Sequence, residues 1–194
     1  MSDVAKSKKP PTYEDILALP EGITGEILDG QLYTSPRPAP PHQRAMIGVS
    51  SPLHQRYAKP PGGGKTGWIF LTEPQIHVAP QDIVPDVAGW RLEKLTDVPK
   101  KVFAEPLITI TPDWVCEILS PSSGTRDRVL KRKIYLELKI GYYWIIDPLN
   151  QTLEEYKFEN SSKWTEMGVF GGEEKFKIEP FNDIEFDLST FWLE

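Results

Sequence analysis

The fold of this 194-residue chain is decided by residues 112–122, Pro112-Asp113-Trp114-Val115-Cys116-Glu117-Ile118-Leu119-Ser120-Pro121-Ser122. The middle of this stretch, from Trp114 to Leu119, is apolar and has turn-forming residues on both sides, which is typical of a strand buried on both faces. Glu117 interrupts the apolar run. A carboxylate in a buried strand is strongly destabilising unless it is paired with a cation or binds a metal. We therefore expect another part of the chain to supply a partner for Glu117.

The residues that follow predict a strand, a helix and a second strand. The segment from Arg126 to Ile140 has apolar residues at helical spacing and Gly141 as its C-terminal stop, and Tyr142 to Ile146 is fully apolar. A helix between two such strands is a βαβ crossover, so we expect the two strands to be parallel. The predicted fold class is α/β, with a mixed β-sheet core flanked by helices.

The rest of the chain predicts further elements around this core. Thr12 should begin a short helix, and residues 25–34 should form a hairpin with Asp29-Gly30 as its turn. A second helix is expected over residues 42–57. Further strands are expected over residues 68–71, 75–79 and 86–90, followed by a β-rich C-terminal meander over 152–158, 164–170, 176–178 and 184–188.

Length and composition are those of an ordinary globular protein. We expect a disordered tail over residues 1–11 and a single domain over residues 12–194. No stretch approaches the ~20 apolar residues of a membrane span, and Cys116 is the only cysteine, so we expect a cytoplasmic protein with no membrane partner. The net charge of −6 argues against a protein that coats nucleic acid. Residues 126–139 nevertheless carry six Lys or Arg against two acids, a local charge of +4.

Asp86 is a second acid at the start of a predicted strand, in the stretch Val84-Pro85-Asp86-Val87-Ala88. Two carboxylates on neighbouring buried strands suit a hard divalent cation such as Mg2+, which takes oxygen ligands and keeps several waters. Either acid alone could instead cap a strand or pair with a basic side chain. Two of them at corresponding positions beside a basic helix favour a metal site.

Lys131, in the helix after the Glu117 strand, is the expected cation of this site. A lysine near a metal can orient an attacking water or stabilise charge on a phosphate. The alternative is an ordinary surface ion pair with Asp127, four residues earlier. Lys133 competes for the role, but it points about 200° around the helix from Lys131. Glu26, on the predicted hairpin, is a third acid that could hold a metal-bound water or face a second metal.

At these residues the chain resembles the PD-(D/E)XK nucleases, the restriction-endonuclease-like superfamily. Pro85-Asp86 matches the PD element and Glu117-Ile118-Leu119 the (D/E)XK element, except that Leu119 replaces the motif lysine. Within the superfamily, the chain is similar to a family of small bacterial proteins regarded as restriction endonucleases. The further segments that carry this similarity are residues 25–30, 42–43, 117–122 and 143–148, and Asp127 with Lys131 and Tyr135.

The resemblance implies a restriction-endonuclease-like fold and a Mg2+-dependent endonuclease acting on DNA, with Mn2+ as an alternative ion. Asp86 and Glu117 would bind the metal, helped by the backbone carbonyl of Ile118. Lys131 would take the place of the motif lysine and assist the attacking water, and Glu26 would support the site. A homodimer is expected, since cutting both strands of a duplex usually takes two active sites.

Two other functions stay open. A family member that is catalytically inactive would use the same scaffold to bind nucleic acid or a protein partner. A structural homo-oligomer could use the aromatic residues of the C-terminal sheet, although most of these are more simply explained as core. The chain has no helix-turn-helix, zinc finger or other DNA-reading module, so it indicates no target sequence.

Overall fold

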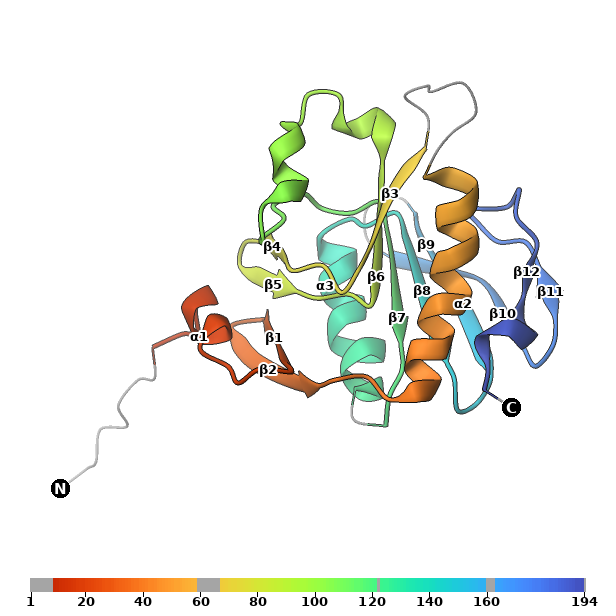
Figure 1. Ribbon diagram of the computed structural model, residues 1–194, viewed down its shortest axis with the longest axis horizontal. Helices are drawn as coiled ribbons and strands as arrows, with labels where there is room; N and C mark the ends of the chain where they lie inside the picture. The colour runs from red at the N-terminus through yellow and green to blue at the C-terminus, as the bar shows by residue number, and fades with distance from the viewer. Residues whose placement is uncertain (1–8, 59–66, 122, 160–162, 194) are drawn as a thin grey trace.

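The computed structural model describes residues 9–58, 67–121, 123–159 and 163–193 (Figure 1). Its main element is a six-stranded sheet in the order β10-β9-β8-β7-β6-β3. The strands are β3 (Trp68–Thr72), β6 (Val87–Arg91), β7 (Trp114–Ile118), β8 (Tyr142–Asp147), β9 (Thr152–Glu159) and β10 (Lys163–Gly171). β7 and β8 are parallel and the other neighbours are antiparallel, which confirms the predicted mixed sheet. Residues 1–8 of the expected tail lie outside the described residues, and residues 9–11 form no helix or strand.

The crossover between β7 and β8 is one helix with two geometries. Arg126–Lys131 form a π-helix, η3, which continues directly into the α-helix α3 (Arg132–Glu137). The sequence predicted a regular helix that stops at Gly141. The helix ends earlier, because Lys139 takes the left-handed conformation with a φ of 56°. A π-helix winds more widely than an α-helix, and such segments are frequent at functional sites.

Different helices cover the two faces of the main sheet, and the alternation along β7 assigns its residues to one face or the other. Three of its residues pack with α2 (Pro40–Tyr57): Trp114, Cys116 and Ile118. Val115 packs on the opposite face, in the apolar cluster that contains α3. Figure 1 shows the sheet running between α2 and α3. Glu117 alternates with Val115 and therefore lies on the α3 side, in an otherwise apolar layer.

A four-stranded antiparallel sheet in the order β2-β1-β5-β4 lies beside the main sheet (Figure 1). β1 (Ile23–Leu28) and β2 (Gln31–Pro36) form the predicted hairpin. Asp29 and Gly30 in its turn have φ values of 47° and 75°, as a type I′ turn requires. β4 (Ile76–Val78) was predicted, whereas β5 (Gln81–Ile83) was not, because three residues of mixed polarity give no strand pattern.

The C-terminal region differs in part from the predicted meander. β9 and β10 pair as expected, but β11 (Lys175–Phe176) and β12 (Phe186–Asp187) form a separate two-stranded sheet, followed by the 3₁₀ helix η4 (Leu188–Phe191). The aromatic residues after β10 that are buried in the core are Phe176, Phe181, Phe186, Phe191 and Trp192. The remaining short helices are α1 (Tyr13–Leu17), η1 (Leu92–Leu95) and η2 (Lys100–Ala104). Within the described ranges, every helix is too short or too polar to cross a membrane.

Glu155 on β9 is a buried carboxylate of the core. The residue is 4% exposed, and among the described residues its Oε1 has no hydrogen-bond partner. Burial raises the pKa of Glu155 to about 7; the charge of Glu179 adds to this, while the backbone N–H of Glu179 and the charge of Lys157 oppose it. The folded protein therefore holds the proton of Glu155 more tightly than the unfolded chain does. The free energy of unfolding consequently decreases as the pH rises from about 4.3, the pKa of an unfolded glutamate, to about 7.

We expect Glu155→Gln to stabilise the protein above about pH 7 and to change little near pH 4. The carboxyl of an unfolded chain titrates near pH 4.3, so the destabilisation by wild-type Glu155 begins there, grows up to its folded pKa and reaches at most about 4 kcal/mol. Urea unfolding of both proteins at about pH 4 and about pH 8 measures the difference. Glu166→Gln, at an exposed acid on β10, is the control and should shift the free energy of unfolding by less than about 0.5 kcal/mol. Equal stability of Glu155→Gln and wild type at the higher pH would contradict this account.

Candidate active site

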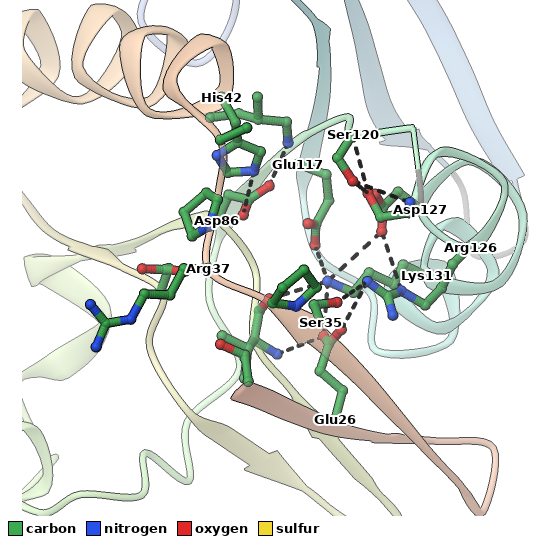
Figure 2. Close-up of a pocket in the computed structure, with 18 of the residues that line it drawn as sticks. Glu26, Ser35, Arg37, His42, Asp86, Glu117, Ser120, Arg126, Asp127 and Lys131 are labelled. Atoms are coloured by element: carbon green, nitrogen blue, oxygen red, sulfur yellow. Dashed lines mark hydrogen bonds and ion pairs between the residues drawn. The ribbon is translucent and has the colours of Figure 1, made fainter. Parts of the chain in front are cut away.

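A cavity of about 330 Å³ lies where the β1–β2 hairpin, the start of α2, the end of β7 and η3 meet. Figure 2 shows side chains from all four elements around it. The carboxylates that line it are Glu26, Glu73, Asp86, Glu117 and Asp127, and the basic side chains are Arg37, His42, Arg126 and Lys131. The four side chains that the sequence singled out thus lie together: Glu26, Asp86, Glu117 and Lys131. Ile118 lines the same cavity.

Strand pairing brings Asp86 beside the Glu117 strand. β6 and β7 are antiparallel, and their last pair is Val87 with Cys116. The next residues beyond this pair are Asp86 and Glu117. Oδ2 of Asp86 accepts a hydrogen bond of 2.6 Å from the backbone N–H of Ile118. The backbone of β7 therefore holds Asp86 against Ile118, the residue that follows Glu117.

The other oxygen of Asp86 faces the first turn of α2. Nε2 of His42 lies 3.1 Å from Asp86 Oδ1. Burial acts to lower the pKa of His42, but the hydrogen bond and charge of Asp86, together with the charges of Glu73 and Asp127, raise it above its ordinary value. Asp86 is thus held between a helix and a strand. In the sequence, His42 belongs to one of the segments that carry the family resemblance.

Lys131 is the cation at the centre of these acids. The residue is 2% exposed, and its Nζ lies 2.8 Å from Glu26 Oε1, 2.9 Å from Glu117 Oε1 and 3.1 Å from the carbonyl oxygen of Val84. These oxygens are as many as the N–H bonds of an ammonium group. Burial acts to lower the pKa of Lys131, but the carboxylates, Glu117 first, raise it, so the side chain stays protonated. The alternative of an exposed surface pair with Asp127 is wrong, because both residues are buried.

Lys133 does not reach the cavity, and Leu119, at the position of the motif lysine, has no ammonium to offer. The side chain of Lys133 is 60% exposed and pairs with Asp29 at 3.2 Å and with Glu137 at 3.6 Å. Leu119, which stands where the motif has lysine, is buried in the apolar cluster on the α3 side. Lys131, from the wide turn of η3, is the lysine that contacts the acids.

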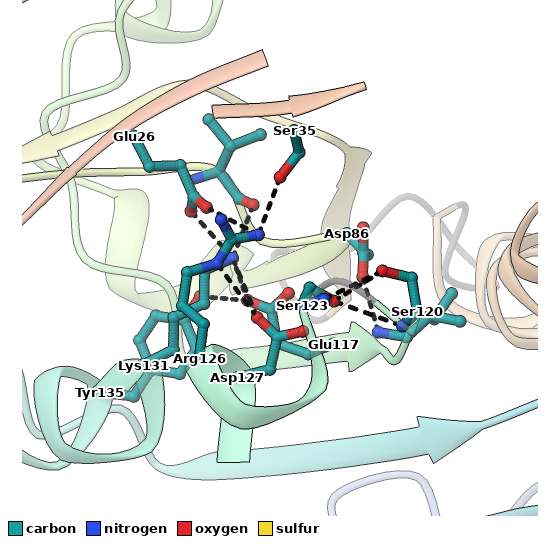
Figure 3. Close-up of polar contacts among 12 residues, drawn as sticks. Glu26, Ser35, Asp86, Glu117, Ser120, Ser123, Arg126, Asp127, Lys131 and Tyr135 are labelled. Atoms are coloured by element: carbon teal, nitrogen blue, oxygen red, sulfur yellow. Dashed lines mark hydrogen bonds and ion pairs between the residues drawn. The ribbon is translucent and has the colours of Figure 1, made fainter. Parts of the chain in front are cut away.

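Glu117 and Glu26 share Lys131 but are otherwise held by different groups (Figure 3). The hydroxyl of Tyr135 donates to Oε1 of Glu117, the same oxygen that Lys131 contacts. Oε1 of Glu26 accepts a hydrogen bond of 2.9 Å from the backbone N–H of Val84. Burial raises the pKa of Glu117 well above its ordinary value, Lys131 opposes this, and the neighbouring carboxylates add to it. A further cation beside Glu117 would therefore stabilise the charged form of its carboxyl.

Arg126 and Asp127 are cavity residues to which the sequence assigned no catalytic role, although Asp127 was named as a possible partner of Lys131 and as part of the family resemblance. Arg126 donates a hydrogen bond of 2.8 Å to Ser35 on β2 and lies 3.8 Å from Asp127. Asp127 is 2% exposed. Burial raises its pKa, while Lys131 and a hydrogen bond with Ser123 oppose this. The spacing of Asp127 and Lys131 was the available signal, but it also describes an ordinary surface pair on a regular helix.

With every acid ionised and His42 neutral, the charges that line the cavity sum to −2, from five carboxylates and three Lys or Arg side chains. The potential ligand atoms of Asp86 and Glu117 are carboxylate oxygens, which suit a hard cation better than zinc. In the described ranges, no group of three or more His, Cys, Asp or Glu side chains is arranged to hold a metal ion. Mg2+ is usually bound through one or two carboxylates and keeps several waters. The pair Asp86 and Glu117 therefore fits magnesium.

Residues 10–190 match the family model Uma2, described as "Putative restriction endonuclease". A solved structure described as a putative nuclease belonging to DUF820, from Anabaena variabilis ATCC 29413, is similar with a TM-score of 0.72 and 20% sequence identity. The match covers 94% of this chain and 97% of that chain; at this identity it shows the fold alone. None of the curated proteins matches the chain.

Replacing Lys131 by methionine should destabilise the protein by about 3–5 kcal/mol at neutral pH, because Glu26 and Glu117 would be buried without their counter-charge. The loss should shrink at about pH 4, where the Glu117 carboxyl holds a proton. Urea unfolding at both pH values measures it. Lys133→Met, at the exposed lysine two residues on, is the matched control and should cost less than about 0.5 kcal/mol. Similar losses for the two variants would mean that Lys131 is not the counter-charge of the buried acids.

Proposed function

The chain belongs to the Uma2 family of putative restriction endonucleases, and on this premise we propose that it is a Mg2+-dependent endonuclease that hydrolyses phosphodiester bonds of DNA. Membership of the family supports a nuclease. Beyond this, the proposal assigns a metal ion (Mg2+, with Mn2+ as an alternative), a DNA substrate and a role for each site residue.

The position of Lys131 is the observation that carries this proposal. The motif lysine is missing from the sequence, since Leu119 stands in its place and packs in the core. Lys131 reaches Glu117 at 2.9 Å from the following helix. The nuclease motif provides an ammonium beside an acidic pair, and in this proposal Lys131 would compensate for the departure at position 119.

Asp86 and Glu117 would hold the metal ion, together with the backbone carbonyl of Ile118. When bound, the ion would polarise the phosphate and lower the pKa of a water molecule. The charge of the cavity supports this assignment, because a net −2 repels a phosphate unless positive charge is added.

The remaining side chains would orient the acids and stabilise the substrate. The charge of Lys131 would assist the attacking water and offset the negative charge that builds up on the phosphate. Glu26 would keep the ammonium in place, since it pairs with Lys131 at 2.8 Å. Tyr135 would keep the Glu117 carboxylate from turning, because its hydroxyl and Lys131 bind the same oxygen.

DNA contacts would come from local positive charge, because the chain as a whole carries −6. Arg37 and Arg126 line the cavity and are the candidates. A homodimer would place two active sites on a duplex. Light scattering measures the molar mass in solution and tests whether the protein is a dimer. The single buried cysteine, Cys116, agrees with a cytoplasmic setting.

The second candidate is a catalytically inactive nuclease-fold protein that binds nucleic acid or a protein partner. The contacts of Lys131 favour it, because its ammonium already meets three oxygens of the protein. Such a cluster is stable as a structural ion-pair network without a metal.

Cleavage of supercoiled plasmid and single-stranded DNA with Mg2+ or Mn2+ tests the proposal. We expect Asp86→Asn, Glu117→Gln and Lys131→Gln each to lower the cleavage rate at least about 100-fold relative to wild type. Lys133→Ala is the control and should cleave like wild type, since its side chain lies outside the cavity. Mn2+ binding, followed by electron paramagnetic resonance, should require both acids.

The pattern of results separates the two functions. Absence of Mn2+ binding by the wild type would rule out the nuclease mechanism. Binding of DNA without cleavage would select the inactive binding protein. Loss of activity in the acid variants and in Lys133→Ala, but not in Lys131→Gln, would reassign the lysine.

A further inference from the structure

Asp127 has a buried carboxylate oxygen that receives no hydrogen bond. The residue is 2% exposed and lines the same cavity as Asp86 and Glu117. Ser123 forms a hydrogen bond with its carboxylate, yet among the described residues Oδ1 of Asp127 has no donor. A buried acceptor without a donor is costly, and in native proteins it usually marks a bound water or ligand.

A donor without an acceptor lies across from this oxygen. Nε of Arg126 is buried and has no hydrogen-bond partner within the described part of the chain. It lies 3.8 Å from Asp127 Oδ1, and Nζ of Lys131 lies 4.0 Å from the same oxygen. Both distances exceed the 2.7–3.2 Å of an N–H···O hydrogen bond. One water molecule that accepts from Arg126 and donates to Asp127 would satisfy both atoms.

The ammonium of Lys131 and both oxygens of Asp86 are already engaged, whereas Nδ1 of His42 is, like Asp127 Oδ1, buried without a partner among the described residues. The ammonium of Lys131 meets three oxygens within 3.1 Å, as many as it has N–H bonds. Oδ2 of Asp86 accepts from Ile118, and Oδ1 faces His42. Asp127 Oδ1 accepts no hydrogen bond from the described residues and lies 4.0 Å from the ammonium of Lys131 (Figure 3), so a water molecule bound to it would lie beside this positive charge.

We propose that Asp127 binds the attacking water through Oδ1 and takes up its proton during hydrolysis. This role rests on the nuclease function proposed above. The water oxygen forms a bond to phosphorus, and one water proton passes to Asp127. The bond between phosphorus and the leaving oxygen breaks, that oxygen keeps the electron pair, and it then takes a proton from solvent. No group is oxidised or reduced, and Asp127 returns its proton to solvent afterwards.

The surroundings of Asp127 suit this role. Burial makes its carboxylate a stronger base than an exposed aspartate. The hydrogen bond with Ser123 leaves Oδ1 open while it orients the group. Lys131, in contrast, would act on the water through its charge and not as its hydrogen-bond partner.

Asp127→Asn tests the inference, because asparagine keeps the shape of the side chain but does not take up a proton. We expect single-turnover cleavage of supercoiled plasmid with Mn2+ to fall about 100-fold or more. The affinities for Mn2+ and for a labelled DNA duplex measured with Ca2+ should change less than about threefold. Asp127→Glu should recover part of the rate. Asp147→Asn is the matched control, since this buried acid pairs with Arg128 outside the cavity, and it should cleave like wild type.

Each outcome decides a separate question. An Asp127→Asn variant that cleaves within about threefold of an active wild type overturns the role of Asp127 and leaves the nuclease function standing. Parallel loss of Mn2+ binding, DNA binding and thermal stability in this variant also overturns it, because that pattern marks a structural residue. A wild type that binds Mn2+ but cleaves no nucleic acid overturns the nuclease function itself, and the catalytic role of Asp127 with it.

Discussion

The rest of the site depends on one buried contact, the ammonium of Lys131 among oxygens from three separate segments. Glu26 comes from β1, Val84 follows β5 and Glu117 lies in β7. Two carboxylates with this degree of burial are tolerated only beside a buried cation. The hairpin, the β5 segment, the main sheet and the crossover helix must therefore meet at one point, and that point is the floor of the cavity.

Sheet geometry decides which acids can meet there. The alternation along β7 sends Glu117 toward α3, while Cys116 and Ile118 pack toward α2. The antiparallel register of β6 and β7 then brings Asp86 next to the same strand, where the N–H of Ile118 holds it. A shift of one residue in this register would turn Asp86 to the opposite face. The acidic pair is thus a product of strand pairing more than of loop conformation.

Much of this could be predicted because the signals were local. The apolar run around Glu117, the Asp29-Gly30 turn and the parallel crossover each follow from a few adjacent residues, and the structure contains all three. The meeting of Asp86, Glu117, Lys131 and Glu26 in one cavity was also anticipated, with the family resemblance as a guide.

The parts that could not be predicted depend on long-range contacts. β5 is only three residues long and exists because it pairs with the hairpin at Ile27 and with β4. The π geometry of η3 has no pattern in the sequence, and it accompanies the burial of Asp127 and Lys131. Without it, their spacing describes a solvent-exposed pair on a regular helix. The contact of Arg126 with Ser35, 91 residues away in sequence, is likewise invisible from either segment alone.

The β1–β2 hairpin has a consequence for how the site can open. It contributes Glu26 and Ser35 to the cavity, yet it pairs with the rest of its sheet only at Ile27 and Asp82 in the described strands. An element that is joined to its sheet by one residue pair, and otherwise by side-chain contacts, can open in local fluctuations that require less free energy than global unfolding. Detachment of this hairpin would leave the six-stranded sheet intact while removing one wall of the cavity. The contacts of Glu26 with Lys131, of Asp29 with Gln81 and of Ser35 with Arg126 are therefore what keeps this wall of the cavity in place.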